Sequence, residues 1–375
     1  MNEQEIRNTL ALTRINYFNL AGMRQLYDVA GSATEIVEHR EHIQDLIPTA
    51  SPRLIEGMKS LDEALKRADA ELEFCQRNDI MPLPMNDAHY PCRLRECDDA
   101  PLLLFYKGTA DLNQQRVINI VGTRHCTVYG QDIIRHFIED LRLHCPQVLI
   151  VSGLAYGVDI CAHRNALQSG YETVGVLAHG LDDLYPARHR ETARQMLGQG
   201  GLLTEFFTQT NADKVNFVRR NRIVAGMSDA AIIIESASKG GSLITARLSR
   251  EYNRETFAFP GPVGAPYSEG CNMLIRDNQA ALITSAEDFV NAMGWQDDAI
   301  LQKAQQKGIE RQIFPQLNET EMKVVTALNQ QNDQQINMLS VKADLSIAQL
   351  TSTLFELEMK GVVKTMAGGV YHLIR

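Results

Sequence analysis

Long apolar runs are missing from this chain of 375 residues, although 44% of its residues are hydrophobic. No stretch approaches the ~20 consecutive apolar residues that cross a bilayer, so we expect no membrane-spanning helix. The polar start, MNEQEIRNTL, lacks the charged segment followed by an apolar one that an export signal requires. The sequence therefore predicts a cytoplasmic protein that has no contact with a membrane.

Paired cysteines and familiar cofactor motifs are missing as well. The seven cysteines are an odd and scattered set, which is not a disulfide framework and suits a reducing compartment. Cys92 and Cys97 lie near His89, but no second pair of ligands follows at zinc spacing, so we expect no metal site. Neither GxGxxG nor a Walker A sequence is present, and we expect no cofactor.

The chain also lacks an overall positive charge, because its net charge is −9. That average disfavours nucleic acid as a ligand only mildly, since screening limits distant charges to about 8–10 Å. One local cluster, KVNFVRRNR at residues 214–222, places Lys and Arg around a Phe. On a helix, Lys214, Phe217 and Asn221 fall on one face, with Arg220 beside Phe217. Cations of this kind neutralise phosphates, and a Phe ring stacks on a base.

Hydrophobic patterning divides the chain into four segments. Residues 1–84 show helical spacing and predict a small helical domain. Residues 85–296 alternate continuous apolar runs with amphipathic segments, which predicts a doubly wound, mostly parallel Rossmann-like sheet. Residues 297–317 are polar and rich in Gln and Lys, as in a linker. Residues 318–375 predict three helices and a hairpin around a Gly-Gly turn, the pattern of a winged helix. The fold class is therefore α/β with two accessory domains.

The expected elements of the central domain have definite bounds. The predicted strands are 117–121, 148–151, 173–177, 202–204, 230–234, 256–259 and 281–283. The predicted helices are 129–144, 158–169, 188–198, 214–225 and 242–253.

Glycine-rich and polar motifs follow nearly all of these strands. The carboxyl ends of parallel strands open on one side of a sheet, so the loops converge on one crevice. Glycines let the backbone approach a ligand, and the helix N-termini that begin there favour an anion. A plain tight turn explains any one of these loops about as well as a ligand does, but a phosphate-bearing ligand explains all of them together better. The loop residues expected at this crevice are Gly122, Thr123, Arg124, Ser152, Gly153, Gly240 and Ser242.

Six motifs occur in order within the central domain: VGTRHCTVYG, SGLAYGVDICAH, GLDDLYP, FVRRNRIVAGMS, GGSLITARLSREYNRETFAFPG and EGCNMLIRDNQA. In their order and spacing they resemble the DNA-processing protein A family, called DprA or Smf, over residues 85–295. The resemblance is looser at both ends. There it implies a SAM-like or helix-hairpin-helix-like domain over residues 1–84 and a winged helix at the C-terminus.

This resemblance implies a homodimer that binds single-stranded DNA. It further implies that the protein protects incoming DNA and helps load RecA recombinase in natural transformation, without enzymatic activity. The DNA-binding residues that it implies, beyond the glycines and serines above, are Arg124, Lys214, Phe217, Arg220, Asn221, Arg222 and Asn272. Where the family often has Phe-Pro before its RNR motif, this chain has Phe217-Val218-Arg219. Without the proline, the helix is expected to begin earlier.

Two other functions remain open at this stage. Nucleotide phosphoribohydrolases share a similar Rossmann core, and Arg124, Glu205 and Glu235 could serve such an enzyme, with Gly240-Gly241 as the phosphate loop. We prefer hydrogen-bonded strand-end carboxylates as the interpretation of both glutamates. The third hypothesis is an interaction scaffold with a vestigial crevice. Histidines 163, 179 and 189 have no evident nucleophile partner and favour packing or capping roles.

The predicted reading helix of the winged helix, Ser346–Lys360, is poor in positive charge. It offers only Lys360, against Glu356 and Glu358. A helix that reads duplex DNA is expected to be basic. A protein-contact or regulatory role is at least as well supported as duplex binding.

Overall fold

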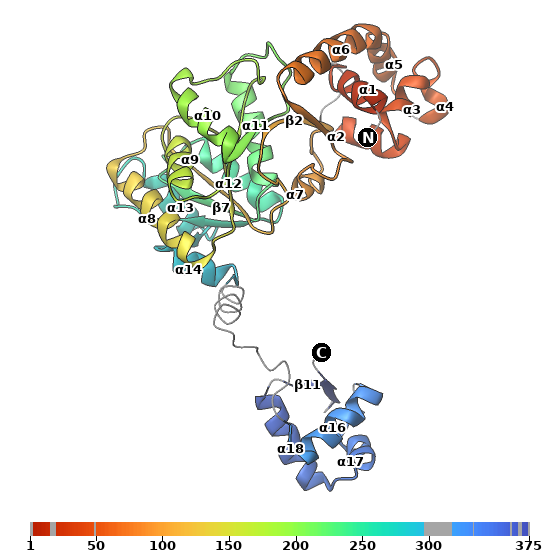
Figure 1. Ribbon diagram of the computed structural model, residues 1–375, viewed down its shortest axis with the longest axis vertical. Coiled ribbons are helices and arrows are strands. Elements are labelled where there is room, and N and C mark those ends of the chain that lie inside the picture. Colours follow the sequence, from red (N-terminus) through yellow and green to blue (C-terminus); the bar gives the residue numbers. More distant parts are fainter. Residues whose placement is uncertain are drawn as a thin grey trace. The chain divides into compact units, whose positions relative to one another are not determined.

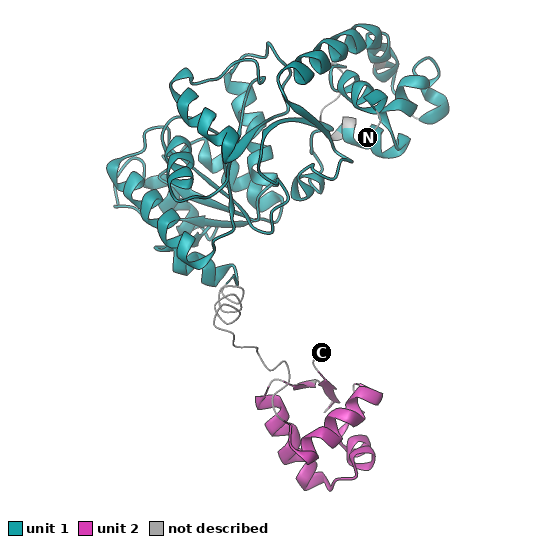
Figure 2. Cartoon of the chain, viewed as in Figure 1, with its two compact units in different colours: residues 1–299 teal, residues 300–375 magenta. Residues whose placement is uncertain are grey.

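The computed structural model describes residues 3–15, 20–48, 50–295, 317–332, 334–360, 362–366 and 370–373. Contacts divide the chain into two compact units, residues 1–299 and 300–375 (Figure 2). Each unit has its own hydrophobic core. The predicted linker, 297–317, lies outside the described residues except for Leu317. None of the described helices is both long and apolar enough to pass through a membrane.

The start of the chain is helical and packs beside the β1–β2 edge of the main sheet (Figure 1). The buried Glu5 carboxylate accepts hydrogen bonds from the backbone N–H groups of Ala33 and Thr34, at 2.7 and 2.9 Å. The Ser32 hydroxyl caps the helix that begins at Ala33 by accepting a hydrogen bond from the Glu35 N–H. The bounds of these helices are α1 (Glu3–Thr13), α2 (Leu20–Ala30), α3 (Ala33–Glu38), α4 (Ile43–Leu46), α5 (Pro52–Met58) and α6 (Leu61–Arg77).

A nine-stranded sheet forms the centre of the first unit. Its order is β1-β2-β6-β5-β4-β3-β7-β8-β9, parallel from β6 to β9, with β2 and β1 added antiparallel at one edge. The strands are β1 (Met81–Pro84), β2 (Leu103–Gly108), β3 (Val117–Gly122), β4 (Leu149–Ser152), β5 (Thr173–Val176), β6 (Gly200–Thr204), β7 (Ala230–Ile234), β8 (Glu255–Ala258) and β9 (Ala281–Leu282). The sequence did not predict β1 and β2.

Helices cover both faces of this sheet. Along β3, Val117 and Val121 belong to one core cluster, while Ile118 and Ile120 belong to the other. Helices α8, α9 and α14 pack on the isoleucine face, and α11, α12 and α13 pack on the valine face. The doubly wound α/β fold is thereby confirmed. The helix bounds are α7 (Cys92–Arg95), α8 (Val128–His144), α9 (Val158–Gln168), α10 (Arg190–Gly198), α11 (Lys214–Gly226), α12 (Ser242–Glu251), α13 (Glu269–Arg276) and α14 (Ala286–Ala292).

The second unit has the predicted winged-helix arrangement. Strands β11 and β12 pair antiparallel, and the short β10 joins the other side of β12. The predicted Gly-Gly turn, 367–369, lies outside the described residues. The elements are α16 (Glu319–Gln330), β10 (Gln334–Gln335), α17 (Ile336–Ala343), α18 (Ile347–Met359), β11 (Val363–Met366) and β12 (Val370–Leu373).

A buried carboxylate joins the helical segment to the loop that follows β6. Glu71 of α6 accepts hydrogen bonds from the Thr208 N–H and hydroxyl, at 2.9 and 2.7 Å, and pairs with Arg67. Removing it leaves these half-buried donors unpaired, so Glu71→Ala is expected to lower the free energy of unfolding by about 1–3 kcal/mol. Denaturant titration measures the change.

Glu73→Ala is the matched control, two residues along the same helix. Glu73 is exposed and, among the residues that the structure describes, its ion pair is with Arg77, one turn away, so its loss should cost below about 0.5 kcal/mol. Equal effects of the two variants would show that the Glu71 contacts do not hold α6 to the loop after β6.

Candidate functional site

The parallel strands β3 and β7 are neighbours, and the chain leaves them toward opposite faces of the sheet. Open α/β sheets bind their ligands at such a point. A Cβ atom at Gly122 would lie 1.9 Å from the carbonyl oxygen of Ile234, so only glycine fits here. The Thr123 N–H donates to the carbonyl of Glu235 at 2.7 Å. The turn that carries Arg124 is thus fixed to the neighbouring strand.

Arg124 extends from this turn as an exposed side chain over an aromatic ring. Its guanidinium carbon lies 4.8 Å from the centroid of Phe217, within the range of a cation–π interaction. The Tyr185 ring meets Phe217 edge-on, with centroids 5.9 Å apart. Lys214 is exposed at the first position of α11, one turn before Phe217. The ion pairs of the described residues involve neither Arg124 nor Lys214, which leaves both charges available to an anion.

Arg220 lies on the same helix near Phe217, with its guanidinium carbon 5.9 Å from the ring centroid, but it is only 3% exposed. Its guanidinium donates to the Val176 carbonyl at 2.5 Å and packs under Gly153, where a Cβ atom would lie 1.9 Å from Nη1. Burial lowers the pKa of Arg220 to about 10, while the charge of the buried Asp159 acts to raise it. Arg220 therefore stays charged at neutral pH. Its Nε–H has no hydrogen-bond partner among the described residues.

The rest of the RNR segment points elsewhere. Arg222 is buried, pairs with Glu205 at 2.5 Å and donates to the Asp99 carbonyl. Arg219 pairs with the same carboxylate at 2.8 Å. Asn221, which lies between Arg220 and Arg222 in the sequence, is half-buried. Contact of Arg222 with a phosphate would require the pair with Glu205 to break.

Gly240, Ser242 and Asn272 form a second group, around the loops that follow β7 and β8. The Ser242 hydroxyl donates to that of Ser236 at 2.8 Å, and a Cβ atom at Gly240 would lie 2.5 Å from the same Ser236 oxygen. The Asn272 amide donates to the Gly261 carbonyl at 2.9 Å and accepts from its N–H at 3.1 Å. These side chains hold the loops in shape, so what the loops present to a ligand is chiefly backbone.

The acidic candidates for enzymatic chemistry are bonded within the protein. Glu235 is buried and accepts from the N–H and hydroxyl of Thr127, at 2.8 and 2.5 Å. With Glu205 paired as described, both glutamates are hydrogen-bonded strand-end carboxylates, the interpretation we preferred. The Ser152 hydroxyl is engaged in the same way, because it donates to the Ile120 carbonyl at 2.6 Å.

The three histidines have structural partners. His163 bonds through Nδ1 to the Thr173 hydroxyl at 2.7 Å, and burial lowers its pKa to about 3, so it stays neutral. His179 accepts from the Tyr185 N–H at 3.1 Å. His189 bonds through Nδ1 to a backbone carbonyl at 2.8 Å. Within the described residues, no three His, Cys, Asp or Glu side chains gather in a group that could hold a metal ion.

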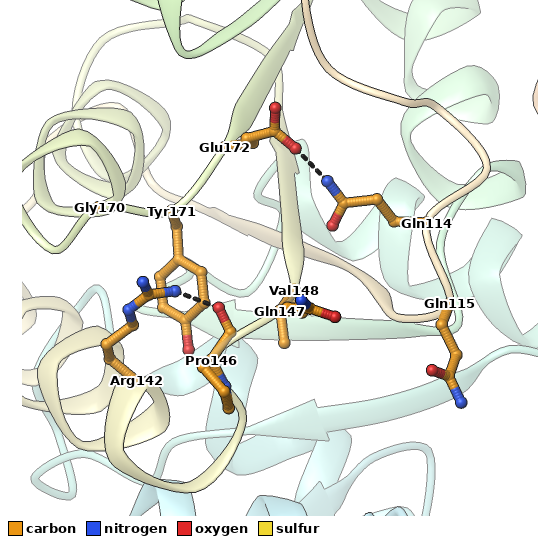
Figure 3. A pocket seen from close by; sticks show the side chains of 9 residues that line it. All are labelled: Gln114, Gln115, Arg142, Pro146, Gln147, Val148, Gly170, Tyr171 and Glu172. Atoms are coloured by element: carbon orange, nitrogen blue, oxygen red, sulfur yellow. Dashed lines mark hydrogen bonds between the residues drawn. The ribbon is translucent and has the colours of Figure 1, made fainter.

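A cavity of about 320 Å³ lies at the opposite, amino edge of the sheet (Figure 3). It opens next to Gln115, Val148 and Glu172, which come just before β3, β4 and β5. The Arg142 guanidinium that faces it packs 5.1 Å from the Tyr171 ring centroid and donates to a backbone carbonyl. None of the loops that follow the carboxyl ends of β3 and β7 lines this cavity.

The sequence analysis did not name two residues that contact this site. Tyr185 contacts Phe217, and Asp159 supplies the charge that faces Arg220. Both stand in motifs that the sequence analysis singled out, GLDDLYP and SGLAYGVD. A signal for Asp159 was available, because an acidic residue in the first turn of a helix faces the helix N-terminus.

Comparison with known proteins adds a family assignment to this geometry. The family model described as DNA recombination-mediator protein A matches residues 82–294, and the DprA winged helix domain model matches residues 311–369. The chain is 32% identical to Protein Smf of Escherichia coli over 330 residues, which cover 86% of this chain and 85% of that protein. It is 38% identical to DNA processing protein DprA of Streptococcus pneumoniae over 204 residues, 54% and 71% of the two chains.

Solved structures agree with this assignment. The X-ray structure of DNA processing protein A from Streptococcus pneumoniae aligns with a TM-score of 0.64 at 31% identity, covering 75% of this chain and 95% of that one. A structure described as showing the single-stranded DNA binding mode of DNA processing protein A from Helicobacter pylori aligns with a TM-score of 0.51 at 29% identity, covering 57% and 95%.

The packing of Gly153 on Arg220 is open to a direct test. The Cβ atom of Gly153→Ala would overlap a guanidinium that is itself buried, so we expect the free energy of unfolding to fall by about 1–3 kcal/mol. Gly198→Ala, in α10, is the control because a Cβ atom there meets nothing within 4 Å. Denaturant unfolding of both variants measures the difference, and an unchanged Gly153→Ala would contradict the placement of Arg220.

Proposed function

The chain belongs to the DNA recombination-mediator protein A family, and from that premise we propose that it binds single-stranded DNA at the crevice between β3 and β7. One observation carries the proposal: an exposed Arg124 with no internal carboxylate partner lies 4.8 Å from the ring of Phe217. A free cation beside an aromatic ring matches the two parts of a nucleotide, its phosphate and its base.

The exposure of each residue indicates its part in binding DNA. Arg124 and Lys214 neutralise phosphates, because both are exposed and neither belongs to an ion pair of the described residues. Phe217 stacks on a base, with Tyr185 steadying the edge of its ring. Arg220 acts from below by supporting the Gly153 loop and adding positive charge to the floor. Because phosphates and ring faces are common to all nucleotides, the protein reads little sequence.

The relatives support this choice of ligand. The Helicobacter pylori protein, described by its single-stranded DNA binding mode, shares 29% identity and aligns over more than half of this chain. The internal pairing of Glu205 and Glu235 argues against the phosphoribohydrolase alternative, since neither carboxylate is free to act on a sugar. Incubation with nucleoside monophosphates should accordingly release no free base.

We further propose that the protein works as a homodimer, protects incoming single strands and helps load RecA recombinase on them in natural transformation. The family's description as recombination mediators supports this step, as does the low sequence preference expected of the crevice. RecA filament assembly on oligonucleotide covered by this protein, compared with bare oligonucleotide, tests the loading step. Sedimentation of the free protein tests the dimer.

The phosphate contacts predict a salt-dependent affinity for oligo-dT. Arg124→Ala should weaken binding about tenfold at low salt, since a charge-assisted contact is lost. It should also reduce the slope of log affinity against log salt by about 0.7, the value for one phosphate of a single strand. Lys214→Ala should act likewise. Fluorescence anisotropy at several salt concentrations measures both quantities.

Arg250→Ala is the matched control, because it removes the same charge from the far end of α12, at the amino edge of the sheet. Affinity and slope should stay unchanged in this variant. Tight binding that Arg124→Ala leaves intact would favour a vestigial crevice, and no binding by the unaltered protein would refute the proposal.

The stacking role of Phe217 gives a separate prediction. Phe217→Leu keeps an apolar side chain but loses the ring, so oligo-dT binding should weaken by about 5- to 150-fold, the loss of one stacked base. The unaltered protein should bind an oligonucleotide with abasic sites more weakly than oligo-dT, whereas the Phe217→Leu variant should bind the two equally. Val218→Ala, the exposed neighbour, serves as control. A variant that still prefers the strand with bases would contradict stacking on Phe217.

A further inference from the structure

A second group of arginines lies beside the crevice, on helices α9 and α10. Arg164 is exposed on α9, Arg188 is exposed in the 3-10 turn Ala187–His189, and Arg190 is exposed at the first position of α10. None of the three belongs to an ion pair of the described residues. Arg164, Arg188 and Arg190 are called the α10 arginine patch below.

Hydrogen bonds hold the patch together. Helices α9 and α10 pack side by side (Figure 1), and the Arg164 Nε donates to the Thr192 hydroxyl at 3.3 Å. Thr192 follows Arg188 by about one helical turn, so this bond brings Arg164 beside the segment that carries the other two arginines. His189, which lies between those two in the sequence, is buried and bonds through Nδ1 to the Leu154 carbonyl at 2.8 Å. The start of α10 is thereby fixed to the loop that follows β4.

Exposed arginines without a carboxylate partner are few in this acidic protein. Most exposed arginines of the described residues pair with an Asp or a Glu, as Arg135 and Arg247 do. Among the described residues, the exposed arginines that belong to no ion pair are Arg14, Arg124, Arg164, Arg188, Arg190 and Arg250. Like charges at neighbouring positions repel each other and destabilise the folded chain. A group of three such arginines is therefore suited to an anionic ligand that compensates them.

The neighbouring carboxylates do not neutralise the patch. Asp182 accepts a hydrogen bond from the Gln209 N–H at 2.8 Å, on the loop after β6. Glu191 pairs with Arg194 at 3.5 Å. Asp183 is exposed and belongs to no ion pair of the described residues. The three guanidinium groups of the patch thus keep their charges for a ligand.

The patch continues the crevice along the chain. Tyr185, whose ring centroid lies 5.9 Å from that of Phe217, precedes Arg188 by three residues. Three residues span at most about 11 Å, so Arg188 follows closely on the aromatic pair. A strand that passes over Phe217 and Tyr185 therefore meets the start of α10 next.

We propose that the α10 arginine patch is a second backbone-binding surface, which holds the phosphates of a single DNA strand where that strand leaves the crevice past Tyr185. This inference rests on the proposed function, because it assigns a path to the same strand. Guanidinium groups bind phosphate oxygens through paired N–H donors, and such contacts carry no sequence information. The patch therefore adds affinity for longer strands without adding a base preference.

The experiment measures binding of an oligo-dT of about twenty nucleotides, longer than a typical single-strand site, to the full chain and to Arg188→Ala/Arg190→Ala. Fluorescence anisotropy at several salt concentrations gives affinity and salt dependence. Affinity should fall about tenfold at low salt, and the slope of log affinity against log salt should fall by about 1.4, or about 0.7 for each phosphate. An oligonucleotide with abasic sites should lose affinity by the same factor, because the patch contacts phosphates alone.

A thymidine dinucleotide separates the patch from the crevice, since it is too short to occupy both. Its inhibition constant against labelled oligo-dT should be the same for the unaltered protein and for Arg188→Ala/Arg190→Ala. The matched control is Arg247→Ala/Arg250→Ala, which removes the same charge from α12. Affinity and salt dependence should stay unchanged in this control.

Glu191→Gln tests the patch by a gain of binding, which a damaged fold does not produce. It removes the one carboxylate of α10, frees the charge of Arg194 and lessens repulsion of the phosphates. Affinity for the long oligo-dT should rise about twofold at low salt, while that for the dinucleotide stays the same.

The outcomes separate the patch from the proposed function. Unchanged affinity of Arg188→Ala/Arg190→Ala for the long strand, in a protein whose binding Arg124→Ala weakens, would overturn the patch and leave the crevice standing. An equal loss for the dinucleotide would place the effect in the crevice and overturn a second surface. An unchanged Glu191→Gln would contradict a strand that passes α10. No binding of oligo-dT by the unaltered protein would overturn both proposals.

Discussion

The buried charge of Arg220 is the constraint on which the rest of the crevice depends. Its guanidinium lies under Gly153, donates to the carbonyl at the end of β5, faces the buried Asp159 and lies 5.9 Å from the Phe217 ring centroid. Burying a charge away from water costs free energy, and fixed partners must compensate for that loss. The loops after β4 and β5 and the first half of α11 are therefore held in one arrangement.

This arrangement also settles which charges can meet a ligand. Arg219 and Arg222 share the Glu205 carboxylate, so their charges are partly neutralised within the protein. Arg124 and Lys214 are exposed and unpaired among the described ion pairs. A protein with a net charge of −9 can thus present exposed cations at this point, because the nearby Glu205 carboxylate is already paired with Arg219 and Arg222.

The sequence predicted the parallel strands because each is a continuous apolar run, and it predicted that α11 begins early, at Lys214, without a proline at 218. It missed β2, and it missed β1 because the prolines of Met81–Pro84 disfavour a strand, which is stabilised by its antiparallel partner. It placed Arg220 beside Phe217 correctly along the helix, yet periodicity carries no information on depth. Burial of Arg220 under Gly153 and of Arg222 against Glu205 comes from tertiary packing.

The winged helix shows the same distinction between the charges a segment contains and those it can use. Helix α18 has no Lys or Arg within Ile347–Met359, and Lys360, which follows it, donates to the buried Glu321 carboxylate at 2.6 and 2.8 Å. The exposed face of α18 instead carries Phe355 and Met359, 66% and 75% exposed. A helix that reads duplex DNA needs cations directed at phosphates and polar groups directed at base edges. These exposed apolar side chains fit contact with another protein surface at least as well as duplex binding, and the role of α18 stays a prediction.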